Sequence, residues 1–213
     1  IPEIKDGPKY TSFISDKPVL LVYPSGIGSW QRDDINGTIR ERYENILDEY
    51  KDTQCYMKEK CKPDGTYRRE GLEKQCGFDL KTLGPCNRDH ASGFGYNNDA
   101  PCLYLRLSKI YGWKPEPEKG KNAVRLHCVA EGDSKTKIDY HPSNVTAFPK
   151  SFWPFRGESA FRTPIAAIQV KGNTKQVKIK CKAIAKNIEL SDTYKLRRGA
   201  YGQIEFTVAA PPA

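Results

Sequence analysis

The sequence predicts a mainly β protein, an immunoglobulin-like antiparallel β-sandwich with one N-terminal helix and disulfide-bracketed loops. From residue 76 onward, short runs alternate apolar and polar residues, which is the pattern of strands with one buried face. Clusters of Gly, Pro, Asn and Asp separate these runs, as turns do in antiparallel sheets. The chain has seven cysteines in 213 residues, and their spacing is not that of metal ligands. Clustered cysteines of this kind are typical of secreted domains, so the sequence also predicts disulfide bonds.

The chain divides at about residue 32. Residues 1–32 are rich in Pro and Gly and show little periodicity, which predicts an extended arm held against another body. Residues 33–213 form a single ectodomain that begins with a helix at about residues 39–51. Thr38 and Glu41 fit a capping box at the start of that helix. Its apolar stripe has helical spacing and predicts core packing: Ile35, Ile39, Tyr43, Ile46, Leu47 and Tyr50.

Four alternating runs predict strands. They are Leu103, Leu105 and Leu107; Val124, Leu126 and Cys128; Val177, Ile179, Cys181 and Ala183; and Ile204, Phe206 and Val208. Cys128 and Cys181 both lie on the inward faces of their strands, which suits a bridge between the two sheets. The segment "FWPF" around Trp153 does not fit a central core strand, because Pro cannot donate to a sheet ladder. The chain is therefore expected to be a divergent immunoglobulin-like sandwich.

Cysteine usage and glycosylation signals indicate an oxidising, extracellular compartment. The sequons Asn36-Gly37-Thr38 and Asn144-Val145-Thr146 predict glycosylation at Asn36 and Asn144. The cysteines are separated by 5, 14, 9, 15, 25 and 52 residues, and the three histidines stand singly, so the spacing does not match a zinc site. We expect neither a metal nor a cofactor.

The net charge of +9 does not by itself indicate nucleic-acid binding. In the densest basic run, Lys178, Lys180 and Lys182 alternate with apolar residues, which is the pattern of a half-buried strand. The least polar run, residues 18–30, is too short and too rich in Pro, Gly and Ser to cross a bilayer. Since the chain starts at Ile1, we expect it to be a trimmed piece of a longer protein whose targeting segment lies upstream.

Enzyme signatures are missing from the sequence. There is no G-x-S-x-G elbow, H-E-x-x-H zinc motif or phosphate-binding loop, and the Gly93–Gly95 pair lacks the third glycine of a dinucleotide site. The pair Asp33-Asp34 fits helix-start charges better than catalytic carboxylates. We predict no catalytic residues.

The run "CGFDLKTLGPCNRDHASGFGYNNDAPCLYLRLSKIYGWKPEP" (76–117) is similar to the cysteine-bracketed core of the β subunit of Na,K-ATPase and H,K-ATPase cation pumps. The resemblance continues in "YENILDEYKD" (43–52), "FWPFRGE" (152–158), "VKIKCKAIAKNI" (177–188) and "GQIEFTV" (202–208). It covers nearly the whole chain.

The resemblance implies three disulfides. It pairs Cys86 with Cys102, Cys128 with Cys181, and Cys76 with an upstream cysteine. We choose Cys61 for that place because "CKPDGTY" is similar to the family's motif, which leaves Cys55 unpaired.

The resemblance also implies a function without an active site. The chain would be the extracellular part of a single-span type II subunit at the plasma membrane, with 1–32 as its membrane-proximal arm and the span missing from this chain. It would bind the catalytic α subunit, help it to mature and reach the membrane, and tune cation affinity. Whether the pump carries sodium or protons stays open, and a pump-independent adhesion or junction glycoprotein is the alternative.

A rigid aromatic segment is the candidate surface for the α subunit, since aromatic residues dominate protein interfaces. Its residues are Phe152, Trp153, Pro154, Phe155, Arg156 and Gly157. These aromatic rings would instead lie inside the domain if they fill its core, and the sequence leaves both interpretations open. No nucleic-acid partner is expected.

Overall fold

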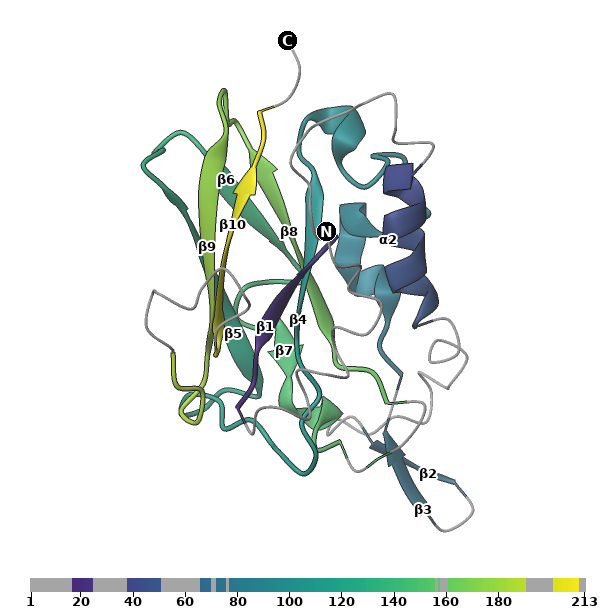
Figure 1. The fold of residues 1–213 in the computed structure, drawn as a ribbon. Helices are drawn as coiled ribbons and strands as arrows, with labels where there is room; N and C mark the ends of the chain where they lie inside the picture. Colours follow the sequence, from purple (N-terminus) through teal and green to yellow (C-terminus); the bar gives the residue numbers. More distant parts are fainter. Residues whose placement is uncertain are drawn as a thin grey trace.

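Two four-stranded antiparallel sheets pack into a sandwich in the computed structural model of the chain (Figure 1). The structure describes residues 17–24, 38–50, 66–69, 72–75, 77–155, 157, 161–190 and 201–210. The predicted fold class is confirmed: the chain is mainly β with few helices and with disulfide bonds in the sandwich.

From residue 102 to residue 184, successive strands of the sandwich alternate between the two sheets. The first sheet has the order β1 (Leu20–Tyr23), β4 (Cys102–Leu107), β8 (Ile165–Lys171) and β6 (Lys137–His141). The second sheet has the order β10 (Gln203–Val208), β9 (Val177–Ile184), β5 (Ala123–Glu131) and β7 (Phe148–Pro149). A separate hairpin pairs β2 (Thr66–Arg69) with β3 (Leu72–Gln75).

The second sheet follows the expected alternation. In β9 the inward-facing residues Val177, Ile179, Cys181 and Ala183 are buried. The lysines between them are exposed (Lys178) or partly exposed (Lys180 and Lys182). The structure therefore confirms that this run is a strand with one solvated face, and its lysines lie on the outer face of the sheet.

The first sheet is covered on both faces. All six residues of β4 are buried, and β8 is buried up to Lys171. Sequence analysis did not identify β8, because a strand that is buried on both faces has a continuous apolar run instead of an alternating pattern.

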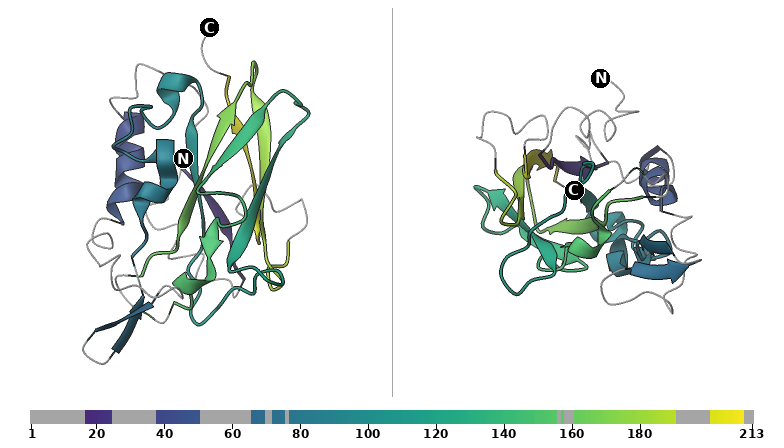
Figure 2. Two further views of the ribbon diagram at one scale, coloured as in Figure 1. Left: turned by 180° about the vertical axis from the view of Figure 1, so that it is seen from behind. Right: turned by 90° about the horizontal axis from the view of Figure 1, so that it is seen from below.

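A helical layer covers the outer face of the first sheet (Figure 2). It contains α2 (Thr38–Asp48) and the 3₁₀ segments η2 (Leu80–Cys86) and η3 (Tyr96–Asn98). Tyr43 of α2 stacks on Phe94 at 4.6 Å between ring centroids and meets Tyr104 of β4 edge-on at 5.4 Å. Its hydroxyl donates to the Cys102 carbonyl. This outer core is distinct from the sandwich core between the sheets.

The helix begins and ends close to the expected residues. It was expected at about 39–51, whereas α2 ends at Asp48 and a turn follows over 49–50. The stripe residues Tyr43, Ile46, Leu47 and Tyr50 are buried as expected. The side chains of Ile35 and Ile39 lie outside the described residues.

Part of the expected arm belongs to the sandwich. Of residues 1–32, the structure describes 17–24, and β1 pairs with β4 along its whole length. Val19 forms a bridge with Tyr201, and the Gly202 amide donates to the Pro18 carbonyl at 3.0 Å. β1 and the beginning of β10 thus close one side of the sandwich, while β6 and β7 end the two sheets on the other side among the described residues.

The Cys128–Cys181 disulfide does not join the two sheets, so the expectation of an inter-sheet bridge was wrong. The two cysteines are directly opposite each other on the neighbouring strands β5 and β9, with Cα atoms 4.0 Å apart. The alternating pattern shows that each cysteine points inward from its strand, but it does not show whether the two strands belong to the same sheet. The bond is thus a cross-strand link within the second sheet.

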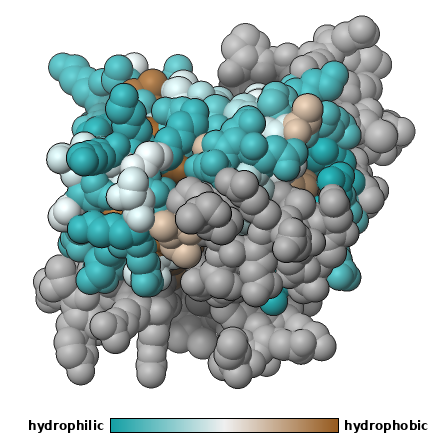
Figure 3. Space-filling view, turned by 90° about the horizontal axis from the view of Figure 1, so that it is seen from above, coloured by the Kyte–Doolittle hydropathy of each residue, from teal (hydrophilic) through white to brown (hydrophobic). Residues whose placement is uncertain are grey.

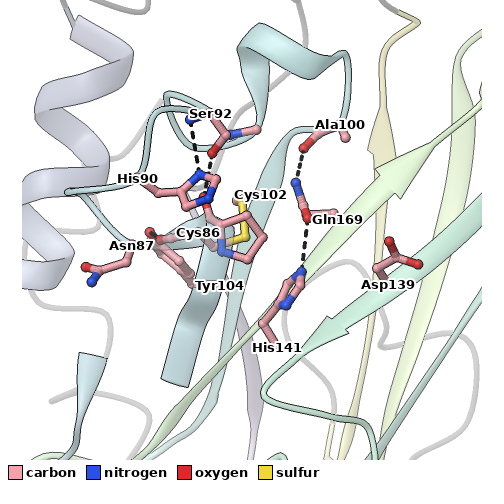
Figure 4. The surroundings of a disulfide bond; sticks show 12 residues. Cys86, Asn87, His90, Ser92, Ala100, Cys102, Tyr104, Asp139, His141 and Gln169 are labelled. Atoms are coloured by element: carbon pink, nitrogen blue, oxygen red, sulfur yellow. Dashed lines mark hydrogen bonds between the residues drawn. A yellow bond between two sulfur atoms is a disulfide. The ribbon is translucent and has the colours of Figure 1, made fainter. Parts of the chain in front are cut away.

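The second disulfide, Cys86–Cys102, closes the loop between η2 and β4 with 5.7 Å between Cα atoms (Figure 4). The buried Gln169 of β8 fixes this loop: its Nε2 donates to the Ala100 carbonyl at 2.8 Å, and its Oε1 lies 3.0 Å from His141 Nε2. Gly95 has φ +84°, and a Cβ there would lie 1.8 Å from the Ala100 carbonyl oxygen, so only glycine fits. Cys55, Cys61 and Cys76 lie outside the described residues.

Candidate partner-binding surface

The aromatic segment 152–157 continues the chain after the edge strand β7. β7 pairs with the start of β5, and the 3₁₀ turn η4 (Lys150–Phe152) then turns the chain. The Trp153 amide donates to the Lys150 carbonyl at 3.2 Å and ends the turn. Arg156 lies outside the described residues.

Trp153 is a core residue. Its side chain is 3% exposed and packs in the sandwich core, where it meets Trp113 edge-on at 5.9 Å between ring centroids. Phe152 is partly buried and packs against both cores, with its ring 5.9 Å from that of Phe78. These two rings therefore connect η4 to the domain interior.

Phe155 lies closer to the surface and contacts two other rings. Its ring centroid is 6.2 Å from Tyr111 and 5.0 Å from the buried Phe161. The Gly112 amide donates to the Phe155 carbonyl at 2.8 Å, so the backbones of the two segments are joined as well. The ammonium group of Lys109 lies 5.3 Å from the centre of the Phe155 ring, within cation–π range.

Tyr111 is the exposed aromatic of this region, and sequence reasoning did not single it out. Its side chain is 72% exposed. A Cβ at Gly157 would lie 3.9 Å from Tyr111 Cε2, so the ring stands over positions 155 and 157. The sequence feature that could have identified Tyr111 is "KIYGWKP" (109–115), in which a tyrosine precedes a glycine just after a strand. We call Lys109, Tyr111, Phe155 and Gly157 together the Tyr111 surface.

The Tyr111 surface lies at one end of the sandwich. It follows the C-terminal end of β4, which is antiparallel to β8, so it is opposite the end with the β8–β9 turn. Figure 3 looks onto the end with that turn, where the described surface is mainly hydrophilic with small, scattered hydrophobic spots. The large hydrophobic side chains that are exposed among the described residues are Tyr111, Val129, Val145 and Leu190, and Tyr111 alone of these is aromatic.

The other expected site residues are separate from this surface. Asn144 is partly exposed in the connection between β6 and β7, and Asn36 lies outside the described residues. Within the described ranges, no group of three or more His, Cys, Asp or Glu side chains is placed to hold a metal ion. The described helices include none with the length and apolar character needed to span a membrane.

Comparison with known proteins identifies the family. Residues 27–205 match the family model of the sodium/potassium ATPase beta chain. Sodium/potassium-transporting ATPase subunit beta-1 of Drosophila melanogaster is 26% identical over 151 residues, covering 59% of this chain and 48% of that protein. Subunit beta-2 of Rhinella marina is 25% identical over 220 residues, covering 90% and 73%.

A third relative, Protein ATP1B4 of Rattus norvegicus, is 25% identical over 174 residues, covering 75% of this chain and 46% of the relative. The chain thus spans about half the length of the Drosophila and Rattus relatives. The family model, by contrast, covers most of this chain. The chain therefore belongs to the family of sodium/potassium ATPase beta chains.

Proposed function

We propose that this chain is the extracellular part of a non-catalytic subunit of a P-type Na⁺/K⁺- or H⁺/K⁺-transporting ATPase, and that it binds the catalytic α subunit. Family membership supports the role of an accessory pump subunit. In this role the chain helps the α subunit to mature and to reach the plasma membrane, and it tunes cation affinity. A membrane span upstream of the chain anchors it. An adhesion role finds no support in the named relatives.

The observation that best supports α-subunit binding is the exposed ring of Tyr111, which packs edge-on against the Phe155 ring. A tyrosine held at its base by Phe155 presents a large apolar area and a hydroxyl at low entropic cost. Such rings are frequent anchors of protein interfaces when a partner pocket covers them. Within the segment expected to bind the partner, Phe155 supports the Tyr111 ring and Gly157 lies close to it, whereas Trp153 packs in the sandwich core.

Copurification tests the proposal. The full-length protein, solubilised gently from its native membranes, should bring down a P-type ATPase α subunit. Tyr111→Ala should lower the recovered α subunit by about tenfold or more, because losing an interface anchor costs at least about 2 kcal/mol. The matched control is Val129→Ala, which truncates an exposed apolar side chain on the outer face of β5 and should leave recovery unchanged.

The outcomes separate two failures. Absence of any P-type ATPase with the wild-type protein would refute the subunit proposal itself. Normal recovery with Tyr111→Ala would leave the subunit role standing and exclude the Tyr111 surface as the anchor.

A further inference from the structure

The outer face of the second sheet carries a row of lysines and is not covered by any described helix or strand. The helical layer lies on the first sheet, on the opposite side of the molecule (Figure 1). Three outward positions of β9 are Lys178, Lys180 and Lys182, and we call these residues the β9 lysine row. Since side chains on one face of a strand repeat about every 6.7 Å, the row extends over about 13 Å along β9.

Acidic side chains balance one end of the row. The Nζ atom of Lys178 lies 3.1 Å from Glu205 Oε1 of β10, and Glu131 of β5 is directly opposite Lys178. Glu205 is opposite Lys180 in the register of β9 and β10, but its ion pair is with Lys178. The carboxylates on the outward positions of β5 and β10 are therefore engaged at, or lie beside, the Lys178 end.

The other two lysines of the row keep an excess of positive charge. Lys180 and Lys182 form no ion pair with any residue that the structure describes. The residues opposite them on β5 are Val129 and His127, and both are exposed. Clustered charges of one sign attract ions of the opposite sign and raise their local concentration. An anionic partner is therefore the kind of partner that fits this face.

The composition of the face distinguishes between classes of anionic partner. Protein interfaces are depleted in lysine and enriched in aromatic residues, methionine and arginine. The outward positions of β5, β9 and β10 include no Phe, Tyr or Trp. Proteins that lie on membranes usually add such rings to their basic residues, and proteins that bind single-stranded nucleic acids stack bases on them. A basic run without aromatic residues fits a linear polyanion such as heparin better.

The chemistry of lysine also fits a chain of sulfate groups. An ammonium group is a compact, strongly hydrated point charge, and it binds anions without the fixed two-point geometry of a guanidinium. We propose that the β9 lysine row binds a sulfated glycosaminoglycan outside the cell, with Lys180 and Lys182 providing most of the affinity. This inference depends on the extracellular location proposed above, and it is independent of α-subunit binding.

Heparin, a heavily sulfated glycosaminoglycan, is the probe for the test. The full-length protein in mild detergent should bind immobilised heparin at an ionic strength of about 0.15 M, and it should bind desulfated heparin much more weakly. The double variant Lys180→Gln with Lys182→Gln should bind heparin at least about tenfold more weakly. The slope of log affinity against log salt should fall by about two, because each lysine that neutralises an anion releases about one counterion.

The matched control is Lys135→Gln with Lys137→Gln. It removes the same charge at the same spacing, from exposed residues in and next to β6 of the first sheet, and should bind heparin like wild type. A second control, Lys180→Arg with Lys182→Arg, keeps the charge and should also bind like wild type. Thermal unfolding of all variants should match wild type, so that a loss of binding reports on the row itself.

Four outcomes would overturn the proposal. They are a wild-type protein that does not bind heparin, an equal loss of binding in the control pair, equal binding to desulfated heparin, and tighter binding to phosphatidylserine vesicles than to heparin. Copurification of the α subunit should be unchanged in Lys180→Gln with Lys182→Gln. Loss of the α subunit in that variant would assign this face to the pump and would overturn the proposal as well, whereas the Tyr111→Ala result bears on α-subunit binding alone.

Discussion

Two aromatic residues of the same region differ in what they contact. Trp153 is 3% exposed and packs on Trp113, while Tyr111 is 72% exposed and rests on Phe155. Trp153→Ala should therefore lower the free energy of unfolding by about 3–5 kcal/mol, because it leaves a cavity in the sandwich core. Tyr111→Ala should change it by about 0.5 kcal/mol or less. Chemical denaturation of the two variants measures both values, and equal losses would contradict the assignment of Trp153 to the core.

At the scale of elements, a buried arginine connects the end of the helix to the first sheet. Arg106 of β4 is buried, and its Nη1 donates to Glu49 Oε2 at 2.7 Å just beyond α2. Its guanidinium lies 4.7 Å from the centre of the Tyr23 ring of β1. Burial opposes the charge, but Tyr50, Tyr23 and Glu49 favour it by more, so the pKa of Arg106 is raised overall. Arg106 thus contacts groups from three parts of the fold.

Removing either member of this ion pair should have unequal effects. Glu49→Ala should destabilise the protein by about 1–3 kcal/mol, because it leaves a buried guanidinium without its carboxylate. Arg106→Met should cost less, since the side chain of Glu49 is half-exposed and can be hydrated. Urea unfolding of the two variants and of the double variant tests this order. A larger loss in Arg106→Met would show that the packing of Arg106 matters more than its charge.

At the scale of the whole molecule, buried tyrosines should set the alkaline limit of stability. Burial raises the pKa of Tyr43, Tyr50, Tyr96 and Tyr104 above the ordinary value. Since these folded-state pKa values are raised, their contribution to stability is fully present below pH of about 10 and is lost as the pH rises further. Tyrosinate absorbance and near-UV circular dichroism, followed in one titration, should show these four hydroxyls ionising together with unfolding. Their ionisation in a folded protein would contradict this.

The sequence predicted those parts of the fold in which one face meets water. β5 and β9 alternate because the outer face of the second sheet is solvated, and the stripe of α2 is helical because its other face is exposed. β8 was missed because α2 and η2 pack on its far side, and that coverage is a tertiary property. The sequence did not reveal the exposed Tyr111 ring for a similar reason. The rings next to it, Phe155 and behind it Phe161, come from a distant part of the sequence and are brought there only by the fold.

The contact between Val19 and Tyr201 has a consequence for the order in which the protein can assemble during synthesis. The segment that includes Val19 leaves the ribosome early, and Tyr201 follows after nearly all of the described strands. Until then, among the described strands, β1 has only β4 beside it, and that side of the sandwich stays open. Contacts between residues so far apart in sequence form late and slowly, because the loop between them must first be ordered. A nascent chain of this family member is thus exposed to mispairing until β10, the last of the described strands, has been synthesised and closes that side of the sandwich.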